Sequence, residues 1–246
     1  MICIFIWTID IYERKARLYP ALLLVAPVVI TLVAILSIRL SVVESVAAAL
    51  LGLLIECGGA FFLSQLAHDA GKQKEKRLFE QWGGMPSVAI FRHRDTRLDA
   101  ITKTRYHKKL ATVVKGARQP SVAGEQSDPD AADQIYAAWS TYLRINTRDT
   151  KKYRLVYEEN ISYGFRRNTW GLRPIGITTN LLCLFALTFW SYVVYHSTHQ
   201  INTKILVAVL CVLVLLFLWL FRFSSQWVRL AADAYAARLV EAIDTL

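Results

Sequence analysis

The chain has 246 residues and a mass of 28.0 kDa; 54% of its residues are hydrophobic, 20% are charged, and its mean hydropathy is +0.33. Because the hydrophobic residues are concentrated in four long blocks, this composition excludes an ordinary one-domain soluble protein and indicates a membrane protein with a charged middle. The formal net charge of +10 further implies a partner or a surface of negative charge.

Residues 1–17 precede the first block and are predicted to form an interfacial segment. The opening MICIFIWTIDIY is too short to span a bilayer, and Asp10 interrupts it. It also lacks the basic start of a secretory signal peptide. A helical lead-in to the first span and a wrongly assigned start at Met1 are the alternatives.

Residues 18–64 are predicted to form a first transmembrane helical hairpin. A helix needs about 20 apolar residues to cross the ~30 Å hydrocarbon core, and residues 18–38 and 42–63 provide two such runs. Pro27 is expected to kink the first run. Since only residues 39–41 connect the two runs, their helices are expected to be antiparallel.

The second run contains two carboxylates, Glu44 near its start and Glu56 well inside it. Glu44 can reach water, whereas a carboxylate at the depth of Glu56 is costly unless it faces protein or water. Small side chains recur around Glu56 at intervals of four residues, a pattern typical of close helix packing: Ala48, Gly52, Ala60 and Ser64. Glu56 is therefore expected to point into the bundle. It is either part of an ion or proton path or a gate, or a neutral acid that donates a hydrogen bond to Ser191, to a main-chain carbonyl, or to Asn180, the most polar residue of the third run.

Residues 65–175 are predicted to form a basic, mainly helical cytoplasmic domain. Helical patterns cover residues 64–81, 100–115, 129–145 and 149–167. Asp128 followed by Pro129 supplies an N-cap and a proline at the first helical position, which predicts where the third of these helices begins.

Turn-forming residues separate the predicted helices of this domain. Gly83, Gly84 and Pro86 end the first helix. Residues 87–92 could form a short strand, although one strand cannot make a sheet by itself, so mainly helix is expected. Residues 116–128 have the composition of a mobile loop.

The domain carries 21 basic and 12 acidic side chains between residues 67 and 175, a surplus of nine positive charges. One explanation is the positive-inside bias together with attraction to anionic lipids, worth ~1 kcal/mol per basic residue near the surface. The other is binding of a nucleotide or nucleic acid by basic side chains interleaved with Phe91 and Tyr106, although no phosphate-binding glycine loop is present. The candidate basic-surface residues are Arg92, Arg94, Arg97, Lys103, Arg105, Lys108, Lys109, Arg166 and Arg167.

Residues 176–222 are predicted to form a second transmembrane hairpin. Residues 176–195 and 205–221 are its two apolar runs, and Gly171 and Pro174 mark where the first of them starts. A short connection again makes the two helices antiparallel.

Basic side chains are concentrated in the middle domain and before the first span, while each short hairpin loop has only one. The positive-inside rule therefore predicts that the middle domain and both termini are cytoplasmic. The expected location is the cell membrane, which is the inner membrane if the protein is bacterial.

Residues 223–246 are predicted to form a C-terminal amphipathic helix that continues the fourth span without a break. Its apolar side chains recur three and four residues apart: Val228, Ala232, Tyr235, Leu239, Ala242 and Leu246. Such a stripe needs a partner. The alternatives are helices of the cytoplasmic domain in the same chain, or the same helix in a neighbouring subunit of a homo-oligomer.

No catalytic or metal-binding motif is recognisable. His93, Arg94 and Asp95 match a kinase catalytic-loop triplet, but Ala100 stands where that loop requires asparagine. The histidines and the four cysteines lack metal-ligand spacing, and the cysteines are expected to be packing residues. The sequence therefore predicts no enzymatic activity, no metal and no cofactor.

Three motifs resemble a group of small uncharacterised bacterial multi-pass membrane proteins: WGGMP at residues 82–86, RYHKKL at 105–110 and YGFRRNTWGLRPIG at 163–176. The resemblance implies a bacterial inner membrane but no activity. The layout of paired spans around a cytosolic helical domain is also similar to that of membrane effectors of bacterial antiphage systems, in which a cytosolic signal triggers membrane leakage.

We therefore expect an oligomeric membrane effector or channel-like component controlled through its cytoplasmic domain by an unknown protein or nucleotide partner. The alternative is a membrane-anchored scaffold that recruits a soluble partner or nucleic acid through its basic surface. A transporter is a third class, which the lack of an internal repeat and of paired broken helices disfavours.

Overall fold

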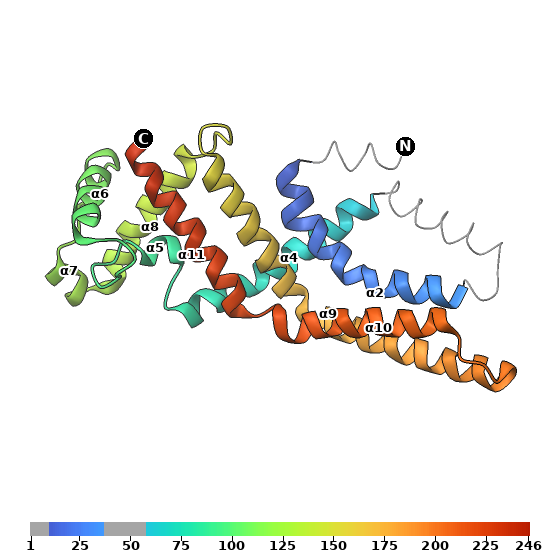
Figure 1. Cartoon of the computed structure of the whole chain (residues 1–246). Helices are drawn as coiled ribbons and strands as arrows, with labels where there is room; N and C mark the ends of the chain where they lie inside the picture. Colours follow the sequence, from blue (N-terminus) through green and yellow to red (C-terminus); the bar gives the residue numbers. More distant parts are fainter. Residues whose placement is uncertain (1–9, 37–57) are drawn as a thin grey trace. The chain divides into compact units, whose positions relative to one another are not determined.

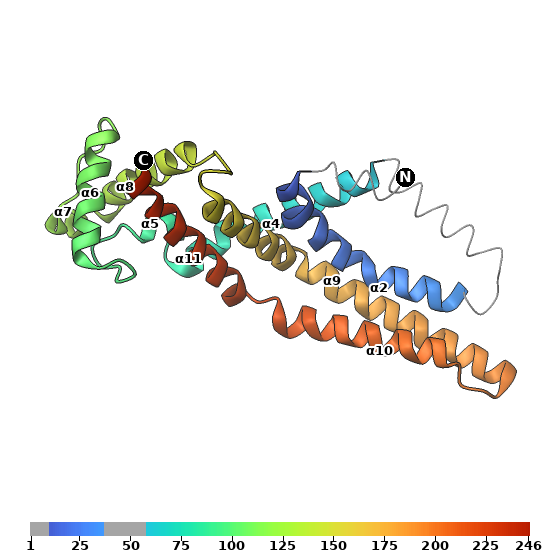
Figure 2. The same cartoon turned by 45° about the horizontal axis from the view of Figure 1, so that its top comes forward.

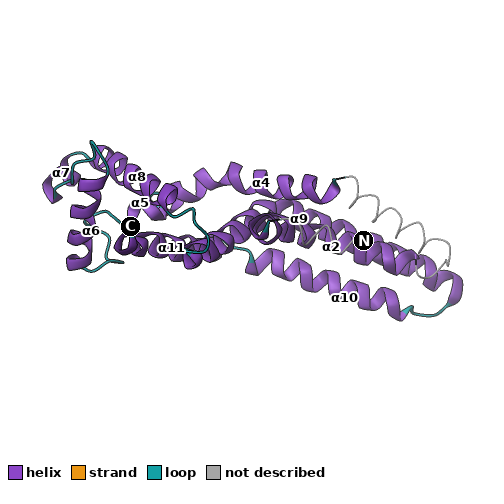
Figure 3. Cartoon of the chain, turned by 90° about the horizontal axis from the view of Figure 1, so that it is seen from above, coloured by secondary structure: helices purple, strands orange, loops and turns teal. Residues whose placement is uncertain are grey.

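The computed structural model describes residues 10–36 and 58–246, and every regular element in these two ranges is a helix (Figures 1 and 3). The prediction of an all-α chain is confirmed for them. In chain order the elements are η1 (Glu13–Leu18), α2 (Tyr19–Leu36), α4 (Gly59–Trp82), α5 (Pro86–Ala89), α6 (Ala100–Val113), α7 (Val122–Ser127), α8 (Pro129–Asn146), α9 (Arg154–Thr198), α10 (Thr203–Phe217), η2 (Leu218–Arg222), α11 (Ser225–Glu241) and η3 (Ala242–Thr245).

Three stretches of helix are long and apolar enough to cross a membrane: Glu13–Leu36, Arg154–Thr198 and Thr203–Arg222. They contain the predicted first, third and fourth spans. The first begins earlier than predicted, because η1 runs directly into α2 as a helical lead-in. The predicted second span lies mostly outside the described residues, as do Glu44, Ala48, Gly52 and Glu56.

The chain divides into two compact units, and the first comprises Met1–Lys74 and Gly164–Val228. Within this unit α2, α9 and α10 run side by side (Figures 1 and 2). Ala34 of α2, Leu187 of α9 and Ala208 of α10 belong to one buried apolar cluster. The facing surfaces of the three helices are therefore joined by ordinary apolar packing.

Helices α4 and α9 approach one another closely within the first unit at small residues. A Cβ atom added to Gly171 would lie 2.5 Å from the backbone atoms of Ala70 and Gly71, far inside van der Waals contact. Asn168, one turn earlier on α9, is fully buried and donates from Nδ2 to the carbonyl of Ala16 at 2.7 Å. Gly171 thus allows a backbone-to-backbone approach that a larger side chain would prevent.

The second unit comprises Glu75–Tyr163 and Arg229–Leu246. Its core holds large side chains with no exposed surface, among them Phe91, Tyr136 and Trp139. Residues of α11 and η3 complete this core, with Leu239 and Ala242 buried in it and Tyr235 and Leu246 packed against it. The C-terminal stripe therefore packs on helices of its own chain, the first of the two predicted alternatives.

Local signals place two helices of the second unit where the sequence predicted them. Asp128 caps α8 by accepting a hydrogen bond from the amide of Ala131 at 2.9 Å, with Pro129 at the first helical position. Asp99 caps α6 in the same way through the amide of Thr102 at 2.8 Å. Both caps satisfy amides that a helix leaves unpaired at its start.

The expectations for the loops of this unit were partly wrong. Residues 116–128 contain a short helix, α7, whose first turn is capped by Ser121 through the amide of Gly124 at 3.0 Å. Residues 87–92 form no strand; they belong to the short helix α5 and the turn after it, which Pro86 initiates at a position where its missing N–H costs nothing.

The predicted helix at residues 149–167 and the third span are one helix, α9, which continues through Pro174. Pro174 has no N–H for the carbonyl of Trp170, but the Lys74 ammonium donates to the adjacent carbonyl of Gly171 at 2.5 Å. The helix begins later than predicted because Asp149 accepts from the amides of Lys151 and Lys152 and holds a turn before it.

The prediction of an unbroken helix from the fourth span to the C-terminus is also wrong. Helix ends at Arg222 and restarts at Ser225, and Phe223 has an extended ψ of 75°. The hydroxyl of Ser224 accepts from the amide of Trp227 at 3.3 Å, which begins α11. Burial of Phe223 between Trp219 and Trp227, at ring-centroid distances of 4.9 and 5.2 Å, stabilises the break.

Candidate functional site

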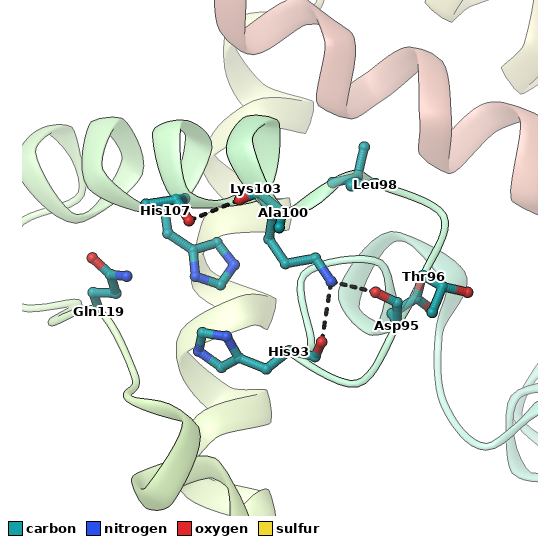
Figure 4. Close-up of a pocket in the computed structure, with 9 residues that line it drawn as sticks. His93, Asp95, Thr96, Leu98, Ala100, Lys103, His107 and Gln119 are labelled. Atoms are coloured by element: carbon teal, nitrogen blue, oxygen red, sulfur yellow. Dashed lines mark hydrogen bonds between the residues drawn. The ribbon is translucent and has the colours of Figure 1, made fainter.

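The second unit contains a polar cavity of about 320 Å³ (Figure 4). One wall is the first two turns of α6, and the other is the turn that follows α5. The lining residues are His93, Asp95, Thr96, Leu98, Ala100, Lys103, Thr104, His107 and Gln119. Most of these residues carry hydrogen-bonding side chains, so the cavity suits a polar ligand better than an apolar one.

Lys103 organises the turn that forms one wall. Its side chain is buried, and Nζ donates to the carbonyls of Arg92 at 2.9 Å, His93 at 3.3 Å and Asp95. Burial lowers the pKa of Lys103 from its ordinary value. Because the three ammonium donors meet three carbonyls, this cation holds the turn in place rather than offering its charge to a ligand.

The imidazoles of His93 and His107 face one another with ring centroids 5.1 Å apart (Figure 4). Nε2 of His107 lies 2.8 Å from the carbonyl of Phe91, and Nε2 of His93 lies 2.9 Å from that of Pro120. Carbonyl oxygens only accept, so each Nε2 carries the proton and each neutral ring keeps an acceptor at Nδ1. Nδ1 of His107 is buried and has no hydrogen-bond partner in the described part of the chain.

A second cavity of about 530 Å³ shares His93 and is bordered by Arg94, Glu125 and Asp133. Glu125 accepts from the backbone amide of His93 at 2.9 Å and from the hydroxyl of Tyr136 at 2.7 Å. Burial disfavours its charge, but these hydrogen bonds outweigh that effect and lower its pKa. Glu125 is thus an ionised tie between α7, α8 and the wall of the first cavity.

Most of the predicted basic-surface residues of this unit are occupied by partners within it. Arg92 binds Asp133 through both carboxylate oxygens, and Arg97 binds Asp95 and Asp233. Arg105 pairs with Asp244 at 3.0 Å, and Lys109 donates to the carbonyl of Ile243 at 2.6 Å. Within residues 10–36 and 58–246, the exposed side chains of Arg94 and Lys108 have no ion-pair partner.

The structure places the two remaining predicted basic residues in the first unit. Arg167 is 4% exposed and donates to the side-chain oxygen of Asn168, so it is an interior residue. Arg166 donates to the carbonyl of Trp227 at 3.1 Å and lies over its indole ring. These two arginines therefore do not join the basic residues of the second unit at one surface.

The predicted intramembrane and helix-packing residues are described only in part. Asn180 is fully buried; Nδ2 donates to the carbonyl of Gly176 at 2.7 Å, and Oδ1 has no donor among the described residues. Ser64 is buried and donates to the carbonyl of Phe61 at 2.8 Å within α4, and Ala60 lies in the first turn of the same helix. The pairing of Asn180 with Glu56 stays a prediction.

Sequence reasoning missed the two histidines, Gln119 and Glu125 as neighbours in space. They come from segments up to 32 positions apart, and no local spacing relates them. Only the match of His93 to a kinase triplet drew attention to this segment, for a reason unrelated to its role in the structure. In the same described part of the chain, no group of three metal-ligating side chains is present.

Burial lowers the pKa of His107 from 6.5 to about 4, against the opposing hydrogen bond to Phe91. Between these two values the unfolded segment binds more protons than the folded one, so stability is full above pH 6.5 and falls as the pH drops towards 4. From pH 7 to pH 5 we expect the free energy of opening of α6, measured by amide hydrogen exchange, to decrease by about 2 kcal/mol. His107→Gln should remove this slope and His68→Gln should retain it; equal slopes in both variants would refute the assignment.

Comparison of the chain with protein-family models, with curated proteins and with solved structures finds no match.

Proposed function

We propose that this protein is a multi-pass membrane protein whose helical bundle acts as an oligomeric, channel-like effector under the control of its water-exposed helical unit. The supporting observation is the large apolar surface of the long helices. On α9, Leu182, Phe185 and Phe189 are 65%, 71% and 58% exposed. On α10 and η2, Leu210 and Phe221 are 63% and 67% exposed. Apolar surface of this extent needs lipid or another helix to cover it.

The two-hairpin arrangement with cytoplasmic termini is part of this proposal. It requires residues 42–63 to cross the bilayer beside the first span, and the surplus of basic residues in the middle of the chain supports that orientation. Labelling of single cysteines introduced at Lys108 and at Gln200 in intact cells tests it. Labelling of position 108 from the outside would contradict it.

The polar cavity of the second unit supports control by a ligand or partner. Its walls come from segments held together by buried hydrogen bonds, so an occupant can bias how α6 packs on the rest of the unit. Control of this kind requires that the occupant binds two states of the unit with different affinity.

The bundle mechanism predicts an effect of Glu56→Gln on ion leakage from liposomes that contain the full chain. Removing the titratable group should reduce leakage about tenfold, as for the loss of one charge-assisted hydrogen bond. Glu44→Gln is the matched control and should leave leakage unchanged. If neither variant alters leakage, or if the wild type releases no ions under any condition tested, Glu56 has no role in conduction.

A scaffold is the second candidate, supported by the exposed, unpaired side chains of Arg94 and Lys108 and by Ile101, which is 84% exposed on the same α6 helix as Lys108. Under this alternative, the double variant Arg94→Glu/Lys108→Glu should weaken co-purification of a protein or nucleotide at least about tenfold. Arg144→Glu/Arg148→Glu makes the same charge change at other exposed positions and should have little effect. Equal losses in both double variants would argue for unspecific charge attraction.

A further inference from the structure

The first unit contains a cluster of cationic and aromatic side chains where the fourth candidate span ends. This arginine–tryptophan cluster consists of Arg166, Arg173, Arg222, Trp219 and Trp227. Arg222 is the last residue of the apolar stretch Thr203–Arg222, and Trp227 lies in the first turn of α11. The cluster thus lies at the break between α10–η2 and α11.

The tryptophans and the end of η2 hold the three guanidinium groups in place. Arg166 and Arg222 lie over the same indole, with their central carbons 5.3 and 4.8 Å from the ring centroid of Trp227. Arg173 donates to the carbonyls of Trp219 at 3.0 Å and Leu220 at 2.8 Å, which the end of the helix leaves without amide partners. Cation–π contacts and carbonyl caps orient these groups without neutralising their charge.

Arg173 and Arg222 have no carboxylate partner in the described part of the chain. Arg173 uses two of its five N–H donors on carbonyls, and Arg222, which is exposed, donates no side-chain hydrogen bond there. Two positive charges with several vacant donors therefore lie near one another. Guanidinium groups of this kind match the oxygen atoms of a phosphate.

The residues just before the cluster identify which phosphate would bind. Phe217, Leu220 and Phe221 are 59%, 39% and 67% exposed, and they precede Arg222 directly. Exposed apolar side chains next to exposed arginine and tryptophan are typical of the level where acyl chains meet headgroups. A lipid satisfies both parts of this surface, whereas a free phosphate ion satisfies only the charged part.

We propose that Arg173 and Arg222, oriented by Trp219 and Trp227, bind the phosphate of an anionic phospholipid headgroup. The inference rests on the proposed membrane insertion and assigns a specific lipid site to it. Occupation of the site holds the break at Phe223–Ser224 at the level of the headgroups, so α11 begins at the membrane surface.

The test uses the full chain in neutral detergent, titrated with phosphatidylglycerol or phosphatidylcholine in mixed micelles and followed by tryptophan fluorescence. The wild type should bind phosphatidylglycerol at least about tenfold more tightly than phosphatidylcholine. Arg222→Gln should remove most of this preference. Arg148→Gln, which removes an exposed arginine of the second unit, is the matched control and should keep it. Equal binding of both lipids, or equal losses in both variants, would overturn the proposal.

Two further arms make every outcome decisive. Arg222→Lys keeps the charge beside Trp227 and should retain the preference for the anionic lipid; if it falls to the level of phosphatidylcholine, charge at this position is not the cause. Inorganic phosphate should compete poorly, and competition as strong as that of phosphatidylglycerol would show a free-anion site instead. A chain that stays soluble after high-speed centrifugation without detergent would refute the membrane proposal itself, whereas a detergent-dependent chain without lipid preference refutes only this site.

Discussion

Replacing Gly171 by alanine is expected to disrupt the contact between α4 and α9 within the first unit and to cost about 1–3 kcal/mol or more. The added Cβ atom would lie 2.5 Å from the backbone of Ala70 and Gly71, and neither helix can yield by rotating a side chain. The expected result is a lower midpoint of thermal unfolding in detergent, with faster hydrogen exchange in the second half of α4.

Gly124→Ala is the matched control for this substitution, because a Cβ atom there meets only the hydroxyl of Ser121 at 3.1 Å. It should change the unfolding midpoint little. If Gly171→Ala were as stable as Gly124→Ala, the close approach of α4 and α9 would not exist in the protein in detergent.

Truncating Trp139 to alanine is expected to cost about 3–5 kcal/mol in the second unit. Trp139 is fully buried, and its ring centroid lies 5.7 Å from Phe91, 5.0 Å from His107 and 5.4 Å from Tyr136. The loss of this ring leaves a cavity among four aromatic side chains, so the unit should become sensitive to protease. Limited proteolysis between residues 75 and 163, with fragments identified by mass spectrometry, measures the effect.

Trp139→Phe is the control, since it keeps most of the volume and removes an indole N–H that has no acceptor in the described part of the chain. It should cost less than about 1.5 kcal/mol. Because the first unit has its own apolar clusters, detergent extraction of both variants should match that of the wild type. Loss of membrane association in Trp139→Ala would show that the two units do not fold separately.

The helical class and three of the apolar helices could be predicted because their signals are local. A run of about 20 apolar residues is recognisable without knowing its neighbours. An Asp-Pro pair likewise marks a helix start, as it does for α8. The loop at residues 116–128 was misjudged because its composition favours turns, while the cap supplied by Ser121 and the hydrogen bonds of Glu125 stabilise one and a half turns of helix.

The fate of the basic residues could not be read from the sequence. A surplus of arginine and lysine suggested one binding surface, but Arg92 and Arg97 are bound to carboxylates 41 and 136 positions away. Long-range pairing of this kind depends on which helix faces which, and composition carries no information about it. The close packing of small residues is similar: Gly171 meets Ala70 and Gly71, a site that no stripe at intervals of four residues marks.

The sequence by itself determined that the chain is helical, where its apolar blocks lie, and how positive charge is distributed between them, because each of these follows from neighbouring residues and their spacing. The tertiary structure alone decided that His93 and His107 face each other across a cavity, that the helix breaks at Phe223–Ser224, and that Arg173 and Arg222 gather around two tryptophans. These features arise from contacts between segments distant along the chain, whose free energy is gained only once the helices have packed.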